Sequence, residues 1–265
     1  MLEVFRAMAT WDSAQYLKFA SERTRPSADL AARVALDSPA RVIDLGCGPG
    51  NSTAVLAGRW PQAALTGLDS SPAMLAAARR DYPQWTWRES GIAEWARENK
   101  ESFDLVFSNA ALHWVPDHAT VLPGLFGAVA TGGALAFQVP HSLGDPHQRF
   151  MRELAASAAW RTRFARTPVI WQVEPVGFYY DTFASRATHT DLWLTDYQLV
   201  FDSLDKIADW HRGAALPPLL ESLPDETARA EFVRDYLVAI APHYPRRADG
   251  KLLLSFRRLF VIAYR

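Results

Sequence analysis

Short apolar runs and helix-spaced apolar positions alternate along the first half of the chain. The runs are bounded by turn residues, which is typical of buried strands, and the longer segments between them repeat apolar positions at helical spacing. The predicted strands are 41–45, 63–68, 85–88, 103–108 and 133–139, and the helices between them are 51–60, 71–80, 92–97 and 117–130. This alternation predicts an α/β fold with a doubly wound, Rossmann-like, mostly parallel sheet and right-handed crossovers.

The pattern changes after Pro140. Helical segments are predicted over 141–166, 203–213 and 225–241, and strands near 189–200 and 257–264. We interpret the two strands as an antiparallel pair that completes a seven-stranded sheet with an antiparallel last strand, and the helical segments as a lid. The predicted domains are N-terminal helices and the sheet core over 1–140, a helical lid over 141–187 and 201–250, and closing strands over 188–200 and 251–265.

The charge balance argues against a nucleic-acid partner. The 265 residues include 28 basic and 29 acidic side chains, so no nucleic-acid-binding face is expected. The adjacent arginine pairs are Arg79-Arg80, Arg246-Arg247 and Arg257-Arg258, and we expect them on solvated faces.

A single cysteine, Cys47, excludes an internal disulfide and suits a reducing compartment. We interpret it as a small buried residue beside a glycine turn. Residues 1–10 lack the long apolar core of a signal peptide, and no apolar run approaches about 18 residues. We therefore expect a cytoplasmic protein with no membrane partner.

A glycine-rich turn follows the first predicted strand, in the sequence Val-Ile-Asp-Leu-Gly-Cys-Gly-Pro-Gly-Asn-Ser. Glycine permits positive φ and places no Cβ between the backbone and a ligand, so Gly46, Gly48 and Gly50 predict a close approach to a nucleotide. Asp69 ends the second strand, 19 residues after Gly50, where a carboxylate can bind a ribose diol. The G-x-G-x-G spacing differs from the dinucleotide fingerprint G-x-G-x-x-G.

Other residues at the carboxyl ends of the strands belong to the same predicted site. Asp44, within the first strand, is expected to reach back and order the amides of the turn. Asn109 and Ala110 end the fourth strand, and Gly91-Ile92 follow the third. Met74 is a candidate to line an adenine pocket, although a methionine in such a pattern is more often a core residue.

These residues together resemble the first signatures of class I S-adenosylmethionine-dependent methyltransferases. The resemblance implies S-adenosyl-L-methionine as the cofactor and S-adenosyl-L-homocysteine as its product. The implied cofactor-binding residues are Asp44, Gly46, Gly48, Gly50, Asp69, Ser70, Met74, Gly91, Ile92, Asn109 and Ala110. Members that methylate planar amines carry Asn-Pro-Pro-aromatic at the fourth strand, whereas this chain has Asn-Ala-Ala-Leu. Such an acceptor is therefore disfavoured.

A narrower resemblance extends over nearly the whole chain. The sequence is similar to trans-aconitate methyltransferases in the stretches 8–19, 22–26, 29–30, 69–75, 107–112, 179–181, 191–193, 244–245, 248–251 and 258–260. It departs from the expected pattern at Gly91, where many relatives have an acidic residue, and at 138–141, which reads Gln-Val-Pro-His.

Membership of that family implies methyl transfer to one carboxylate of trans-aconitate, which gives a monomethyl ester. A carboxylate with a pKa near ~4 is ionised at neutral pH, so neither a general base nor a metal is expected. Catalysis would depend on alignment of the reacting atoms under the lid.

The other two carboxylates need cations and hydrogen-bond donors, which arginine supplies in pairs. The residues expected to bind the acceptor are Tyr16, Arg25, His113, Trp114, Tyr179, Tyr180 and Arg186. Simple packing or a surface position is the alternative for each of them. The expected partner is a small polycarboxylate, and the protein is expected to be a monomer or a homodimer.

Three other functions are considered from the sequence. One is methyl transfer to another small carboxylic or hydroxylated metabolite, and another is S-adenosylmethionine binding without turnover. The third is a nicotinamide-dependent oxidoreductase, which the glycine spacing and the lack of a recognisable Tyr-x-x-x-Lys pair disfavour.

Overall fold

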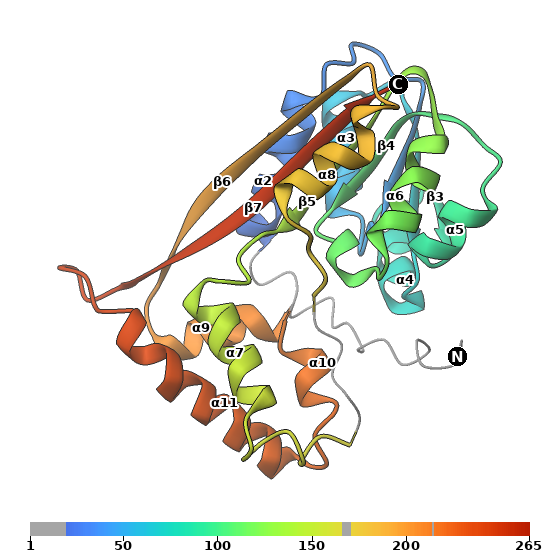
Figure 1. Ribbon diagram of the computed structural model, residues 1–265. Coiled ribbons are helices and arrows are strands. Elements are labelled where there is room, and N and C mark those ends of the chain that lie inside the picture. Colours follow the sequence, from blue (N-terminus) through green and yellow to red (C-terminus); the bar gives the residue numbers. More distant parts are fainter. Residues whose placement is uncertain (1–19, 166–170, 214) are drawn as a thin grey trace. The chain divides into compact units, whose positions relative to one another are not determined.

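Seven strands form one sheet in the part of the chain that the structure describes. The computed structural model describes residues 20–165, 171–213 and 215–265. The strand order is β3-β2-β1-β4-β5-β7-β6; β1 to β5 are parallel and β7 runs antiparallel to β5 (Figure 1). The strands are β1 Arg41–Leu45, β2 Ala64–Asp69, β3 Thr86–Glu89, β4 Phe103–Asn109, β5 Val129–Pro140, β6 His189–Phe201 and β7 Leu252–Tyr264. The predicted mostly parallel α/β sheet is confirmed.

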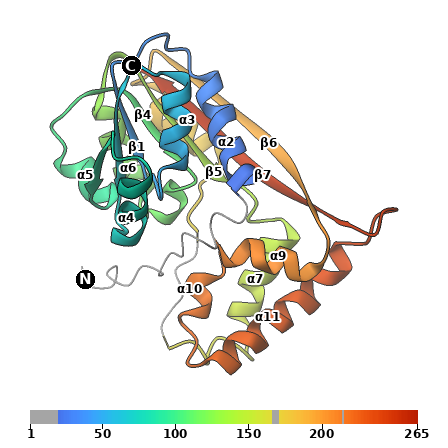
Figure 2. The same cartoon turned by 180° about the vertical axis from the view of Figure 1, so that it is seen from behind.

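Helices cover both faces of this sheet. On one face α2 and α3 lie side by side (Figure 2), and α5, α6 and α8 cover the other (Figure 1). The helices are α2 Ala20–Arg33, α3 Asn51–Arg59, α4 Pro72–Asp81, α5 Ile92–Glu98, α6 His118–Gly127, α7 Pro146–Ala156, α8 Val176–Ala184, α9 Leu204–Arg212, α10 Pro217–Leu220 and α11 Glu226–Ile240, with 3₁₀ turns η1 Leu112–Trp114 and η2 Ala241–His243. In the described ranges, no helix combines the length and apolar character needed to cross a membrane.

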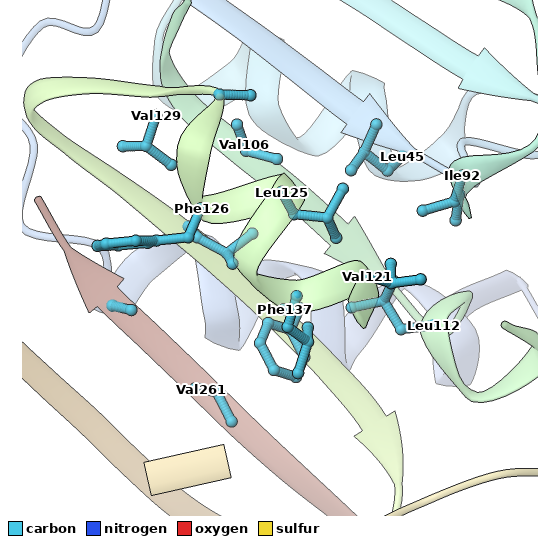
Figure 3. Close-up of a cluster of buried hydrophobic side chains, with 14 of the residues drawn as sticks. Leu45, Ile92, Val106, Leu112, Val121, Leu125, Phe126, Val129, Phe137 and Val261 are labelled. Carbon is cyan, nitrogen blue, oxygen red and sulfur yellow. The ribbon is translucent and has the colours of Figure 1, made fainter. Parts of the chain in front are cut away.

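The main core fills the space between the sheet and helices α5, α6 and α8. Figure 3 shows Phe137 of β5 and Val261 of β7 beneath the α6 side chains Leu125 and Phe126. Phe183 of α8 completes this layer, with its ring 5.5 Å from Phe126 and 6.5 Å from Phe137. Burial of such side chains stabilises the sheet that carries the site by roughly 1.5–3 kcal/mol for each large apolar group.

The chain divides into two structural units. One contains the sheet core and includes residues 20–141, 172–195 and 257–265; the other includes residues 142–165, 171, 196–213 and 215–256 and is mainly helical. The sequence analysis assigned all of 141–187 to the lid, but the structure places α8 with the sheet core. The reason is packing, because Tyr179 and Phe183 are completely buried in the core cluster of the sheet.

The start of β5 also differs from the prediction. Helix α6 ends at Gly127 and β5 begins at Val129, so the glycine pair 132–133 lies inside the strand instead of joining a helix to it. The pairing with β4 shifts from Phe103↔Val129 to Leu105↔Ala134. Gly132 has φ +81°, and a Cβ on Gly133 would lie 2.5 Å from the Asp104 carbonyl oxygen. These two glycines therefore accommodate the irregularity and keep β5 in the sheet.

Candidate active site at the carboxyl edge of the sheet

The glycine turn after β1 is closely packed on one side and open on the other. The backbone N–H groups of Gly46 and Cys47 both donate to the Leu68 carbonyl, at 2.7 and 3.1 Å. Gly46, Gly48 and Gly50 have φ values of +70°, +55° and +97°. A Cβ on Gly46 would lie 2.2 Å from the Ala111 Cβ, whereas a Cβ on Gly48 would meet nothing within 4 Å. The backbone is thus accessible at Gly48, as a close-approaching ligand requires.

Asp69 connects the end of β2 to this turn. Its Oδ2 accepts a 2.9 Å hydrogen bond from the Gly48 amide, and its Oδ1 accepts a 2.8 Å bond from the Ser71 amide. Burial raises the pKa of Asp69, and the backbone hydrogen bonds act in the opposite direction. Ser71 itself caps α4, and the neighbouring Ser70 is exposed. The carboxylate is therefore held at the edge where the sequence predicted a ribose-binding acid.

Asp44 does not order the turn amides, so that part of the prediction is wrong. Its Oδ2 instead accepts hydrogen bonds from the Ser52 and Thr53 hydroxyls of α3, at 2.6 and 2.7 Å. The side chain is 1% exposed, and its Oδ1 has no hydrogen-bond partner among the described residues. Burial is the main cause that raises the pKa of Asp44 to about 6. A buried carboxylate oxygen with remaining acceptor capacity suits a cationic or hydrogen-bond-donating ligand group.

Two of the residues predicted to border an adenine ring are buried at the same edge. Met74 and Ile92 are 5% and 9% exposed, and the Ile92 Cδ1 lies 3.5 Å from the position of a Cβ on Gly46. Gly91 is the residue before α5, and a Cβ there would meet nothing within 4 Å. Space beside the backbone is therefore present at Gly91 as well as at Gly48.

The end of β4 is tied to β5 by main-chain and side-chain bonds. Ala110 has φ +53°, which is unusual for a residue with a Cβ, and its N–H donates to the Gln138 carbonyl at 3.1 Å. The Gln138 Nε2 donates to the Asn109 Oδ1 at 2.6 Å, and its Oε1 accepts from the Arg258 Nη1 at 3.2 Å. A row of hydrogen-bonded side chains thus crosses three neighbouring strands, β4, β5 and β7.

Arg258 was not predicted to belong to the site. It was expected on a solvated face together with Arg257. Arg257 is indeed exposed, but Arg258 is buried, with an exposed fraction of 5%. The burial pattern in β7 explains the difference, since Leu254, Phe256 and Arg258 occupy alternate positions and all three are buried. Alternate residues of a strand share a face, so Arg258, two residues before the apolar Phe260, could have been predicted from the sequence to be buried.

His113 and Tyr179 are brought into one buried cluster through His118, which the sequence analysis did not single out. The His118 Nδ1 lies 3.0 Å from the Tyr179 hydroxyl, and its Nε2 lies 2.9 Å from the Leu112 carbonyl oxygen. Burial lowers the pKa of His113 well below its ordinary value, and the nearby Arg258 charge and His118 lower it further. His113 is therefore neutral at physiological pH, and its ring centroid lies 4.9 Å from that of Trp114.

Three other residues expected to bind the acceptor are exposed at the surface. Tyr180 is 53% exposed, and Arg25 and Arg186 are exposed as well. Tyr179 is completely buried, and its hydroxyl also accepts a 3.1 Å bond from the Glu174 amide. The structure thus gives Tyr179 protein partners in the core and gives Tyr180 a surface position. Tyr16 lies outside the described residues.

Comparison with known proteins extends this picture to the whole chain. Residues 42–133 match the family model described as a methyltransferase domain. Trans-aconitate 2-methyltransferase of Azoarcus sp. (strain BH72) is 45% identical over 258 residues, which cover 97% of this chain and 100% of that protein. The enzymes of that name from Methylobacterium radiotolerans and Methylobacterium nodulans are 46% and 47% identical, and each match covers 97% of this chain.

Solved structures with little sequence identity share the fold. The YcgJ protein from Bacillus subtilis superposes with a TM-score of 0.60 at 13% identity, over 91% of this chain and 99% of that one. Phosphoethanolamine N-methyltransferase 2 of Haemonchus contortus has a TM-score of 0.51 at 15% identity, over 91% of this chain and 52% of that one. Because the trans-aconitate 2-methyltransferases are similar over nearly their full length, the chain belongs to the trans-aconitate 2-methyltransferase family.

Proposed function

We propose that the protein transfers a methyl group from S-adenosylmethionine to one carboxylate of trans-aconitate, giving the monomethyl ester and S-adenosylhomocysteine. The observation that carries the proposal is the 45% identity to the Azoarcus enzyme over 97% of this chain. That similarity includes the helical unit as well as the sheet core. In this proposal the helical segments 142–165 and 204–243 serve as the lid predicted from the sequence.

The residues at the carboxyl edge fit S-adenosylmethionine. Space beside Gly48 and Gly91 allows close approach to the backbone, and the buried Oδ1 of Asp44 retains acceptor capacity for the amino group of the cofactor. The Asp69 oxygens each have a second lone pair for the ribose hydroxyls. The remaining cofactor residues in the proposal are Gly46, Gly50, Ser70, Met74, Ile92, Asn109 and Ala110. When bound, the cofactor supplies an electrophilic methyl group on a sulfonium sulfur.

The protein's contribution to this chemistry is binding and alignment. The acceptor carboxylate is already ionised at neutral pH, so no side chain has to remove a proton. Holding the nucleophilic oxygen in line with the methyl group can contribute up to ~7–11 kcal/mol to lowering the barrier. His113 is buried and neutral beside Trp114 at this edge, so it does not supply one of the cations that the acceptor carboxylates need.

The proposal is tested by product analysis with methyl-labelled S-adenosylmethionine. The acceptor panel contains trans-aconitate, cis-aconitate, citrate, isocitrate and a malonyl thioester, and products are identified by mass spectrometry before and after mild alkaline hydrolysis. We expect labelled trans-aconitate monomethyl ester, which alkali cleaves. Label on a different acid would assign another acceptor, and an alkali-stable product would contradict carboxyl transfer. S-adenosylmethionine binding with no labelled product would indicate a non-catalytic binder.

A further inference from the structure

Asn109, Gln138 and Arg258 lie on one face of the sheet at its carboxyl edge. Asn109 is directly opposite Gln138 in the β4–β5 register, and Gln138 is opposite Phe260 in the β5–β7 register. Arg258 lies two residues from Phe260, and alternate residues of a strand point to the same side. The exposed fractions of Asn109, Gln138 and Arg258 are 8%, 0% and 5%. A guanidinium is thus buried at the end of a side-chain hydrogen-bond chain.

Gln138 fixes the orientation of that guanidinium. Its amide donates through Nε2 to Asn109 and accepts through Oε1 from Arg258, so the two bonds determine which way the amide faces. Arginine has five N–H donors in a planar fork, and the bond through Nη1 to Gln138 restrains that plane. Lysine at this position would retain a positive charge but not the planar fork.

This chain of side chains is close to the glycine turn. Ala110, the residue after Asn109, donates its N–H to the Gln138 carbonyl. The next residue, Ala111, packs against Gly46, since a Cβ on Gly46 would lie 2.2 Å from the Ala111 Cβ. The Arg258 charge also acts on His113. The guanidinium therefore belongs to the same edge of the same structural unit as the proposed cofactor site.

We propose that Arg258, oriented by Gln138 and Asn109, binds a carboxylate of the acceptor that is not methylated, and thereby makes the enzyme selective for polycarboxylates. The inference rests on the proposed function, which requires a cation for the non-reacting carboxylates. Arginine–carboxylate pairs with two parallel hydrogen bonds are strong and directional. A pair shielded from water gains more from this attraction than an exposed one. Of the arginines considered, Arg25 and Arg186 are exposed, whereas Arg258 has the required burial.

The test compares Arg258→Gln and Arg258→Lys with the matched control Arg257→Gln, which removes an exposed charge one residue away. Binding of trans-aconitate is measured by calorimetry with S-adenosylhomocysteine present. The kcat/KM is measured for trans-aconitate and for two diacids, mesaconate and itaconate, each of which keeps the carboxylate on carbon 2 and lacks a different one of the other two. Removing one partner of a buried charge pair costs about 30-fold or more in affinity. We expect that loss for Arg258→Gln with trans-aconitate and with the diacid that keeps the carboxylate bound by Arg258, and a much smaller loss with the other diacid. S-adenosylhomocysteine affinity should remain within about twofold, as should all values for Arg257→Gln.

The readouts separate this inference from the proposed function. Arg258→Lys should bind trans-aconitate more tightly than Arg258→Gln and more weakly than the wild type. If Arg258→Gln does not fold, the same measurements are made on Arg258→Lys and Gln138→Leu and compared with the wild type. An equal loss with all three acceptors, unchanged trans-aconitate binding in the variants, or a wild type that does not bind trans-aconitate would overturn the inference. A wild type that binds trans-aconitate through Arg258 but produces no ester would contradict only the proposed function.

Discussion

The Gly48 amide donates a 2.9 Å hydrogen bond to the Asp69 Oδ2, joining the glycine turn after β1 to the acid that ends β2. The two residues are 21 positions apart in the chain. Through this bond Asp69 supports the turn, and its position at the end of β2 makes it the candidate ribose ligand. Changing one of these residues should therefore affect cofactor binding through the other.

Asp69→Asn should weaken S-adenosylmethionine binding by about tenfold or more, because an amide can accept only through one oxygen and carries no charge. The KM for trans-aconitate should change much less than the cofactor Kd. Calorimetry with S-adenosylhomocysteine measures the effect, and Asp37→Asn, at an exposed position before β1, is the matched control. A cofactor Kd equal to that of the control would remove Asp69 from the site.

Gly48→Ala should impair cofactor binding more than it impairs folding. The left-handed backbone at φ +55° costs a residue with a Cβ about 1–2 kcal/mol. The methyl group would enter the space beside Gly48, which we assign to the cofactor. We expect a modest fall in melting temperature and a loss of cofactor affinity of about tenfold or more, the free-energy equivalent of about 1.4 kcal/mol.

Gly58→Ala provides the control for that variant. Gly58 lies in α3, is exposed, and a Cβ there would meet nothing within 4 Å. Alanine in a helix is favoured over glycine by roughly 0.5–1 kcal/mol, so this variant should melt slightly higher and bind the cofactor normally. Normal cofactor affinity in Gly48→Ala as well would mean that the ligand does not approach the turn there.

Asp44→Asn should stabilise the ligand-free protein at neutral pH while weakening cofactor binding. Burial raises the pKa of Asp44 from 3.8 to about 6, so the folded state holds this proton more tightly than the unfolded state. Stability from this group is therefore lost as pH rises from about 4 to 6. The shift of about two units corresponds to roughly 3 kcal/mol at pH 7, and the asparagine variant should recover part of it.

Two pH profiles check this prediction. The difference in unfolding free energy between Asp44→Asn and the wild type should be largest above pH 6 and should shrink towards pH 4. Cofactor affinity of the wild type should fall as the pH drops below about 6, because protonation removes the charge that attracts the amino group, whereas the variant should bind weakly at all pH values. Parallel affinity profiles for the two proteins would exclude Asp44 as a ligand.

Tyr179→Phe should reduce stability without changing acceptor affinity. The hydroxyl accepts a hydrogen bond from the Glu174 amide and lies 3.0 Å from the His118 Nδ1, in a completely buried position. Leaving buried partners unsatisfied costs about 1–3 kcal/mol. Denaturant unfolding and the KM for trans-aconitate provide the two measurements, with Tyr180→Phe as the exposed control. A raised acceptor KM with unchanged stability would support the role first expected for Tyr179.

The features that could be predicted from the sequence are those encoded locally. The alternation of apolar runs and helical spacing identified β1 to β5, and the glycine turn with Asp69 identified the cofactor edge. Each of these depends on residues close together in the chain, such as a strand followed directly by its turn. The hydroxyl partners of Asp44 were not predicted, because nothing in the sequence shows whether this carboxylate faces the glycine turn or the Ser52 and Thr53 hydroxyls of α3.

Features that depend on long-range pairing were not predicted. Arg258 reaches Gln138 across 120 residues, and the β5–β7 register that joins them is not visible in either segment alone. Two adjacent arginines are typical of a solvated surface, so the local composition led to the wrong prediction that Arg258 is exposed. Similarly, α8 was assigned to the lid together with the other segments between Pro140 and the closing strands, whereas Tyr179 and Phe183 pack into the sheet core.

The most direct test of the account is a single reaction with ¹³C-methyl S-adenosylmethionine and trans-aconitate, followed by NMR. We predict that the labelled methyl resonance of the sulfonium disappears as a methyl ester resonance appears in equal amount, in a reaction that requires the protein. Transfer of the label to nitrogen or to a hydroxyl oxygen, or no transfer while the cofactor is bound, would contradict the account.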